Sequence, residues 1–170
     1  MKRTLKRSVG IVLSLCLLLS LLPMTALAAG SFQIRVTPDL SEVQAGDTIQ
    51  YTVTATGSNI SAAQFRLVIP EGMTYVEDSA SVPADTRSKL GWAAADWTDA
   101  SMWWSGYNHI GTDFEDTVLM TFSCIATEAG TGTIELAELI PYDGDFEEVA
   151  PQVTVGSVTV APGTGLPEIP

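Results

Sequence analysis

The chain has 170 residues, of which 20 are acidic and eight are basic, so its formal net charge at pH 7 is −12. This acidic balance excludes nucleic acids and anionic membrane surfaces as partners, because both are bound through lysine and arginine. The length allows one domain with a sizeable core and is too short for two such domains.

The N-terminal segment has the features of a secretory signal peptide. Four basic residues within the first seven positions precede an apolar run over 11–22, and small residues ending at Ala28 supply a cleavage site. The run is shorter than the roughly 20 residues needed to span a bilayer. We therefore predict a signal peptide over 1–28 and a secreted, extracellular or cell-surface protein. Since all 20 acidic residues and only four basic ones remain, the mature charge would be about −16.

Cleavage would leave Cys124 as the last cysteine, so no intramolecular disulfide could form and the core must hold by packing. Cys124 shares a strand face with Met120 and Phe122. It is predicted to be a small buried residue, not a reactive thiol.

The rest of the chain predicts an all-β protein. Ile49, Tyr51 and Val53 alternate with polar residues, and Phe65 and Leu67 repeat the pattern. No segment has a convincing helical period. The pattern favours an antiparallel β-sandwich over 31–160. The nine predicted strands are 32–37, 48–56, 62–69, 74–77, 90–97, 101–107, 118–126, 133–140 and 152–160. The predicted common core is Tyr51, Val53, Phe65, Leu67, Trp104, Met120, Phe122 and Ile134.

The last strand changes phase. Val153 and Val155 fall one residue out of step with Val158 and Val160, which predicts a β-bulge at Gly156. Residues 161–170 contain three prolines and no periodicity, so we expect a linker or tail. A linker there suggests either a gene product that continues or a small secreted module that stands alone.

An aromatic cluster is the sharpest functional signal. All four tryptophans fall within 92–104, and Tyr107 follows closely. On one strand, Trp104 and Met102 share a face while Trp103 and Tyr107 share the other, so one of the adjacent tryptophans should be core and one outward. If exposed, Trp103 and Tyr107 would lie roughly 13 Å apart, as a platform for sugar rings or a protein partner. The alternative is that a neighbouring loop covers them.

Catalytic and metal chemistry has little support in the sequence. His109 is the single histidine and lies in a turn-like segment, so a zinc site or a Ser-His-Asp set cannot be assembled around it. A glycosidase pair of carboxylates is disfavoured because the acids fall mostly in turns and on polar strand faces. We expect no catalysis, no cofactor and no metal. Two acidic clusters could hold calcium or be plain solvated turns: Asp113, Glu115 and Asp116, and Asp143, Asp145, Glu147 and Glu148.

The order of these segments resembles a cohesin module. The resemblance is carried by the Gly-Asp opening at Gly46, the Ile-Ser-Ala-Ala-Gln-Phe run from Ile60, the break at Pro70, the strand from Val118 and the closing Gly-Ser-Val-Thr-Val from Gly156. It implies a jelly-roll sandwich and a monomeric, non-catalytic receptor for a dockerin-type protein. The setting it implies is an extracellular polysaccharide-degrading or cell-surface assembly.

The resemblance also implies where the partner binds. In the best-known cohesins, the strand with this frame carries an Asn and an Asp two residues apart, whereas Ala62 and Gln64 stand here. Hydrogen-bond capacity is lost at one place and charge at the other, which leaves the dockerin type open. The implied partner-binding residues are Gln64, Arg66, Trp103 and Tyr107. Two alternatives remain: a carbohydrate-binding module that recognises a cell-wall polysaccharide through an aromatic face, and a structural or adhesive spacer.

Overall fold

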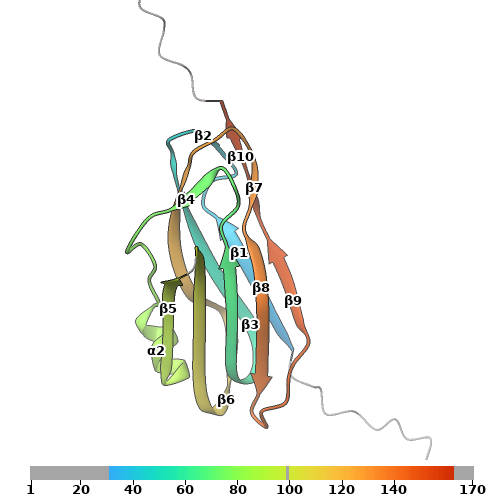
Figure 1. The fold of residues 1–170 in the computed structure, drawn as a ribbon. Coiled ribbons are helices and arrows are strands. Elements are labelled where there is room, and N and C mark those ends of the chain that lie inside the picture. The colour runs from blue at the N-terminus through green and yellow to red at the C-terminus, as the bar shows by residue number, and fades with distance from the viewer. Residues whose placement is uncertain (1–30, 99, 163–170) are drawn as a thin grey trace, which may run out of the picture.

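The computed structural model describes residues 31–98 and 100–162, and this part of the chain is a β-sandwich with one short helix (Figure 1). The elements are β1 (Phe32–Pro38), β2 (Glu42–Gln44), β3 (Thr48–Val68), β4 (Met73–Tyr75), α2 (Ala84–Leu90), β5 (Trp92–Thr98), β6 (Ser101–Ala126), β7 (Gly130–Thr133), β8 (Glu135–Asp143), β9 (Pro151–Val155) and β10 (Ser157–Ala161). The predicted signal peptide over 1–28 lies outside the described residues, as does most of the predicted tail. No helix in the described ranges is long and apolar enough to cross a bilayer.

Two long strands, β3 and β6, run through both layers of the sandwich. They pair antiparallel from Thr48 opposite Ile125 to Val68 opposite Ser101, with register shifts between Val53 and Ala62. Such shifts bend a strand pair, and the halves on either side of them join different layers. The sequence predicts separate strands at 48–56 and 62–69, and at 101–107 and 118–126. That separation is wrong, because the pairing continues through the bend.

One layer consists of β9, β1, the first half of β3, the second half of β6, and β4. The other consists of β5, the first half of β6, the second half of β3, and β8. Figure 1 looks onto this second layer, whose four strands lie side by side. A small sheet of β2, β10 and β7 closes one end of the molecule.

The core lies between the layers and is the one that the alternation predicts. All eight predicted residues are buried. Phe65 stacks on Trp104 with ring centroids 5.0 Å apart, and Tyr51 stacks on Phe122 at 5.1 Å. The Trp104 indole Nε1–H donates a hydrogen bond of 3.2 Å to the Leu119 carbonyl in the opposite layer. Trp104 thereby joins the two layers by both packing and a hydrogen bond.

Helix α2 corrects the expectation that no segment is helical. The helix has seven residues and buries only Thr86 and Leu90, one i, i+4 pair. A single pair gives too little periodicity to be recognised in a sequence. Gly91, with a φ of 69°, ends the helix in a conformation that favours glycine. The Thr86 hydroxyl donates to the Val118 carbonyl, which attaches the helix to β6.

The predicted bulge at Gly156 is also wrong. The phase change there marks the point where the chain leaves one sheet for another. β9 pairs parallel with β1, whereas β10 pairs with β2 and β7. The Gly156 N–H donates a 2.9 Å hydrogen bond to the Val36 carbonyl. A Cβ at Gly156 would lie 2.6 Å from Pro38 Cδ, so the close approach of the two segments requires glycine.

Candidate binding face

The outward surface of β5, β6, β3 and β8 gathers the predicted site residues. Directly opposed residues in antiparallel strands point to the same side of a sheet. Three cross-strand rows result, and we call their surface the aromatic face. The rows are Trp92, Tyr107, Ala62 and Tyr142; Ala94, Ser105, Gln64 and Ile140; and Asp96, Trp103, Arg66 and Ala137. All four residues implied by the resemblance, Gln64, Arg66, Trp103 and Tyr107, therefore share one face.

Arg66 is held in place in the row of the aromatic face that also contains Trp103. Its guanidinium carbon lies 5.7 Å from the Trp103 ring centroid, a cation–π arrangement. One guanidinium nitrogen lies 2.8 Å from Glu138 Oε1. The Arg66 Nε is covered and has no hydrogen-bond acceptor among the described residues. The side chain is therefore oriented before a partner arrives.

Sequence reasoning missed Glu138. The residue has a φ of 51° and sits where the register between β3 and β8 shifts, between Gln64 and Arg66. This irregularity turns Glu138 toward Arg66. A strand pattern read as regular alternation cannot reveal it.

A second cluster of rings occupies the end of the aromatic face. The Tyr107 hydroxyl lies 2.8 Å from His109 Nδ1, and its ring centroid lies 6.4 Å from that of Phe146. Trp92 is opposite Tyr107 on β5. Exposure is 54% for Trp92, 51% for Phe146 and 37% for Tyr107, so the rings of this cluster remain accessible to solvent. The phase of the predicted strand 90–97 could have placed Trp92 here, whereas Phe146 lies in a loop without periodicity.

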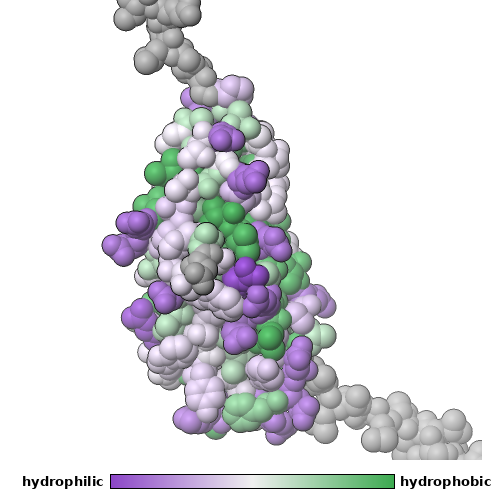
Figure 2. All heavy atoms as spheres, viewed as in Figure 1, coloured by the Kyte–Doolittle hydropathy of each residue, from purple (hydrophilic) through white to green (hydrophobic). Residues whose placement is uncertain are grey.

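The centre of the face is more polar. Gln64 is exposed, and Ala62, Ala94 and Ser105 are partly exposed. Figure 2, which looks onto the same side of the molecule, shows hydrophilic side chains beside hydrophobic ones. The surface thus combines exposed rings with polar groups, as protein-binding and sugar-binding surfaces do.

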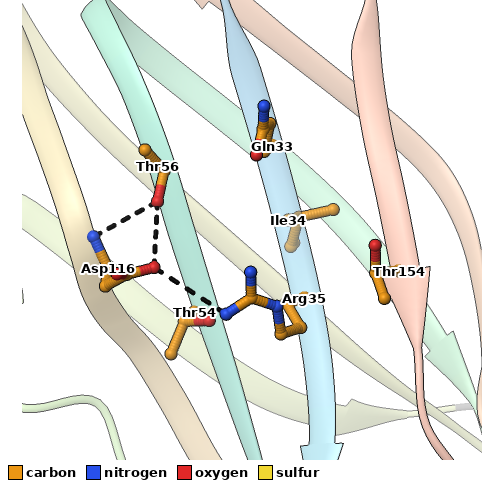
Figure 3. A pocket seen from close by; sticks show the side chains of 7 residues that line it. All are labelled: Gln33, Ile34, Arg35, Thr54, Thr56, Asp116 and Thr154. Carbon is orange, nitrogen blue, oxygen red and sulfur yellow. Dashed lines mark hydrogen bonds and ion pairs between the residues drawn. The ribbon is translucent and has the colours of Figure 1, made fainter.

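The opposite outer face offers much less. Figure 3 shows its pocket, where Arg35 lies 3.9 Å from Asp116 and the Thr56 hydroxyl donates to the same carboxylate at 3.1 Å. The remaining lining includes Thr54 and Thr154. The cavity measures about 20 Å³, room for a water molecule but not for a sugar ring.

Three of the groups considered for chemistry, Cys124, Asp113 and Asp143, are buried or hydrogen-bonded within the fold. Burial raises the pKa of the Cys124 thiol to about 12, so the thiolate nucleophile is not formed at neutral pH. The Asp113 carboxylate accepts the Asn59 N–H at 2.9 Å. Asp143 accepts backbone N–H groups from two residues of its own loop, at 2.9 and 3.0 Å. No group of three metal-ligating side chains occurs in the part of the chain that the structure describes.

No protein-family model matches this sequence, and no curated protein matches it either. Solved cohesin structures do match its fold. A non-cellulosomal cohesin from the archaeon Archaeoglobus fulgidus is 14% identical, with 77% of this chain and 91% of that chain covered at a TM-score of 0.60. A type I cohesin from Clostridium thermocellum, solved as a cohesin–dockerin complex, is 11% identical, with 78% and 94% covered at 0.62. The sixth cohesin of scaffoldin B from Acetivibrio cellulolyticus, in complex with a Cel5 dockerin, is 15% identical, with 77% and 99% covered at 0.61. The chain therefore has the cohesin fold, as the resemblance implied.

Proposed function

We propose that this protein is a secreted, non-catalytic binding module that docks a dockerin-type protein on its aromatic face. The observation that carries the proposal is a set of exposed rings and an oriented arginine on one sheet of a cohesin fold. Two of the similar cohesins were solved in complex with dockerins. An assembly that degrades polysaccharides or decorates a cell surface is the setting in which such docking would operate.

Recognition would rest on aromatic anchors. Ala62 cannot form the side-chain hydrogen bonds of an Asn, and Gln64 does not carry the charge of an Asp. Trp, Tyr and Arg dominate the binding energy of many protein interfaces, and Trp103, Tyr107 and Arg66 are these residue types. Because Trp103 and Glu138 already orient Arg66, little side-chain entropy would be lost on binding.

A polysaccharide is the second candidate ligand. Trp92 and Tyr107 are opposed on neighbouring strands and expose their rings on a sheet surface. Apolar rings of this kind stack on the faces of sugars. A glycan would use this end of the aromatic face and would not require Arg66.

Calorimetric titration of the mature protein with purified type I and type II dockerins and with soluble cellulose, xylan and pectin derivatives tests the proposal. We expect a dockerin to bind and the R66A/W103A variant to lose that binding with a melting temperature within a few degrees of the parent. The matched control is T54A/T121A on the opposite face, which should bind normally. Glycan binding alone would favour the second candidate, and no binding would favour a spacer. No reducing sugar should be released in any of these titrations.

A further inference from the structure

A second recognition feature lies beside the aromatic face, where the edge strands of the two layers meet. β4 belongs to one layer and β5 to the other, and each pairs only with β6 among the described strands. The loop after β4 and helix α2 are attached to β6 along the side of the sandwich between these two strands. A cavity of about 380 Å³ lies there, lined by Tyr75, Glu77, Asp78, Ala80, Ala95, Asp96 and Trp97. Its volume is in the range of small-ligand sites.

The inner wall of this edge cavity is aromatic and preformed. Tyr75 from β4 and Trp97 from β5 stack with ring centroids 4.4 Å apart and an interplanar angle of 20°. Both rings pack against the core and stay partly exposed. The Tyr75 hydroxyl also accepts the Ala80 N–H at 3.2 Å, which ties the loop after β4 to the wall. A ligand would therefore meet ring surface that needs no rearrangement.

The outer rim of the cavity is anionic. Glu77, Asp78 and Asp96 are exposed, and none of them forms an ion pair with a basic side chain in the described ranges. The two ion pairs there join Arg35 to Asp116 and Arg66 to Glu138. Three carboxylates thus lie around an aromatic wall, and no basic side chain between residues 31 and 162, position 99 aside, lies within ion-pair distance of them.

This combination selects an organic cation. The alkyl stem of a lysine or arginine side chain buries well along apolar surface, while its charged head prefers carboxylates and the face of an indole ring. A neutral sugar would leave the three charges unused, and an anion would be repelled. We propose that the edge cavity binds an alkylammonium or guanidinium group.

The position of Asp96 points to the molecule that would supply the alkylammonium or guanidinium group. Asp96 is opposite Trp103 and belongs to the aromatic face, whereas Ala95 and Trp97 of the same strand turn toward the core. The cavity thus begins at the border of the docking surface. This assignment rests on the proposed function: the occupant is a lysine or arginine side chain of the docked partner, and it reaches around the edge of β5.

The indole N–H resonance of Trp97, assigned with the W97F variant, reports on the cavity directly. We would titrate the mature protein with Nα-acetyl-lysine amide and Nα-acetyl-arginine amide, and use Nα-acetyl-norleucine amide as the uncharged control of similar length. Both cations should shift this resonance saturably, and the norleucine amide should not. E77Q/D78N/D96N should weaken binding at least roughly tenfold, whereas E42Q/E71Q/E128Q, which removes the same charge elsewhere, should not.

Three results would overturn the cavity assignment: no saturable shift, an equal response to the norleucine amide, or equal weakening in both triple variants. A second arm tests the source. A bound dockerin should protect Trp97 from shifts by the amides, and E77Q/D78N/D96N should weaken dockerin binding. If the amides bind but no dockerin does, the cavity stands while the proposed function fails. If a dockerin binds without affecting Trp97, the docking function stands and the partner side chain is not the occupant.

Discussion

The two outer faces of the sandwich share strands β3 and β6, yet they differ in chemistry. The first half of β3 presents Thr52, Thr54 and Thr56 outward, and its second half presents Gln64 and Arg66. Across from them, β6 contributes Trp103 and Tyr107 only to the second face. The hydroxyl-rich face suits solvent, whereas the aromatic face exposes rings that water does not favour. Two strands that are shared by both layers can therefore present a hydroxyl-rich surface on one side and an aromatic surface on the other.

The largest effect should come from the core that both faces share. Trp104→Ala removes the stack on Phe65 and the hydrogen bond to Leu119, and should lower the free energy of unfolding by about 3–5 kcal/mol. The adjacent Trp103→Ala change, on the outer face, should cost about 1 kcal/mol or less. Urea denaturation measures both. Similar losses for the two variants would show that Trp103 also belongs to the core.

The second-largest effect should be a loss of folding stability at alkaline pH, which acts on the core between the two layers. Burial raises the pKa of Cys124 from its ordinary 9.0 to about 12, and it raises the pKa of Tyr51 as well. Between about pH 9 and 12 the unfolded thiol has lost its proton while the native thiol keeps it, so stability present below pH 9 is lost as pH rises. The loss attributable to Cys124 should be roughly 1 kcal/mol per pH unit. Cys124→Ala should flatten the pH dependence measured by denaturation; an unchanged slope would assign it to other groups.

Binding should separate the two faces at constant stability. Trp92→Ala, at the exposed end of the aromatic face, should weaken partner binding at least roughly tenfold, as loss of an aromatic anchor does. Thr54→Ala, on the hydroxyl-rich face, should change the dissociation constant less than about twofold, because isolated exposed hydroxyls contribute little. Isothermal titration calorimetry with the dockerin that binds the parent protein most tightly measures both dissociation constants. Equal effects would mean that the partner spans both faces.

The smallest difference concerns the two ion pairs. Arg66 and Glu138 approach to 2.8 Å with side chains 30% and 49% exposed, whereas Arg35 and Asp116 stay 3.9 Å apart at 56% and 77%. A double-mutant cycle should give about 0.2–1 kcal/mol for the first pair and near zero for the second. High salt should reduce the first value. A larger coupling in the second pair would contradict the assignment of the hydroxyl-rich face to solvent.

Much of this arrangement follows from period-2 alternation, which is a local property. It places Phe65 and Trp104 inside and Arg66 and Trp103 outside, because a half-buried strand leaves little choice. Alternation does not predict features that depend on contacts between residues far apart in the sequence. The bend near Gly57 is set by pairing with β6, and the departure of β10 at Gly156 is set by the sheet that receives it.

In the candidate site, too, some residues could be placed from local sequence patterns and others could not. Gln64, Arg66, Trp103 and Tyr107 could be placed on one face from phase and from the resemblance. Glu138 could not, because its left-handed backbone arises at an irregularity in the β3–β8 register. The stack of Tyr75 on Trp97 joins strands of different layers, a contact that no local pattern contains.

The most direct test of docking on the aromatic face is an NMR titration of the ¹⁵N-labelled mature protein with the dockerin that binds it most tightly. We predict that backbone amide shifts cluster on β5, β8 and the halves of β3 and β6 that pair with them, with Arg66 and Trp103 among the most affected. Shifts confined to β1, β9 and the threonines of the first half of β3 would contradict it.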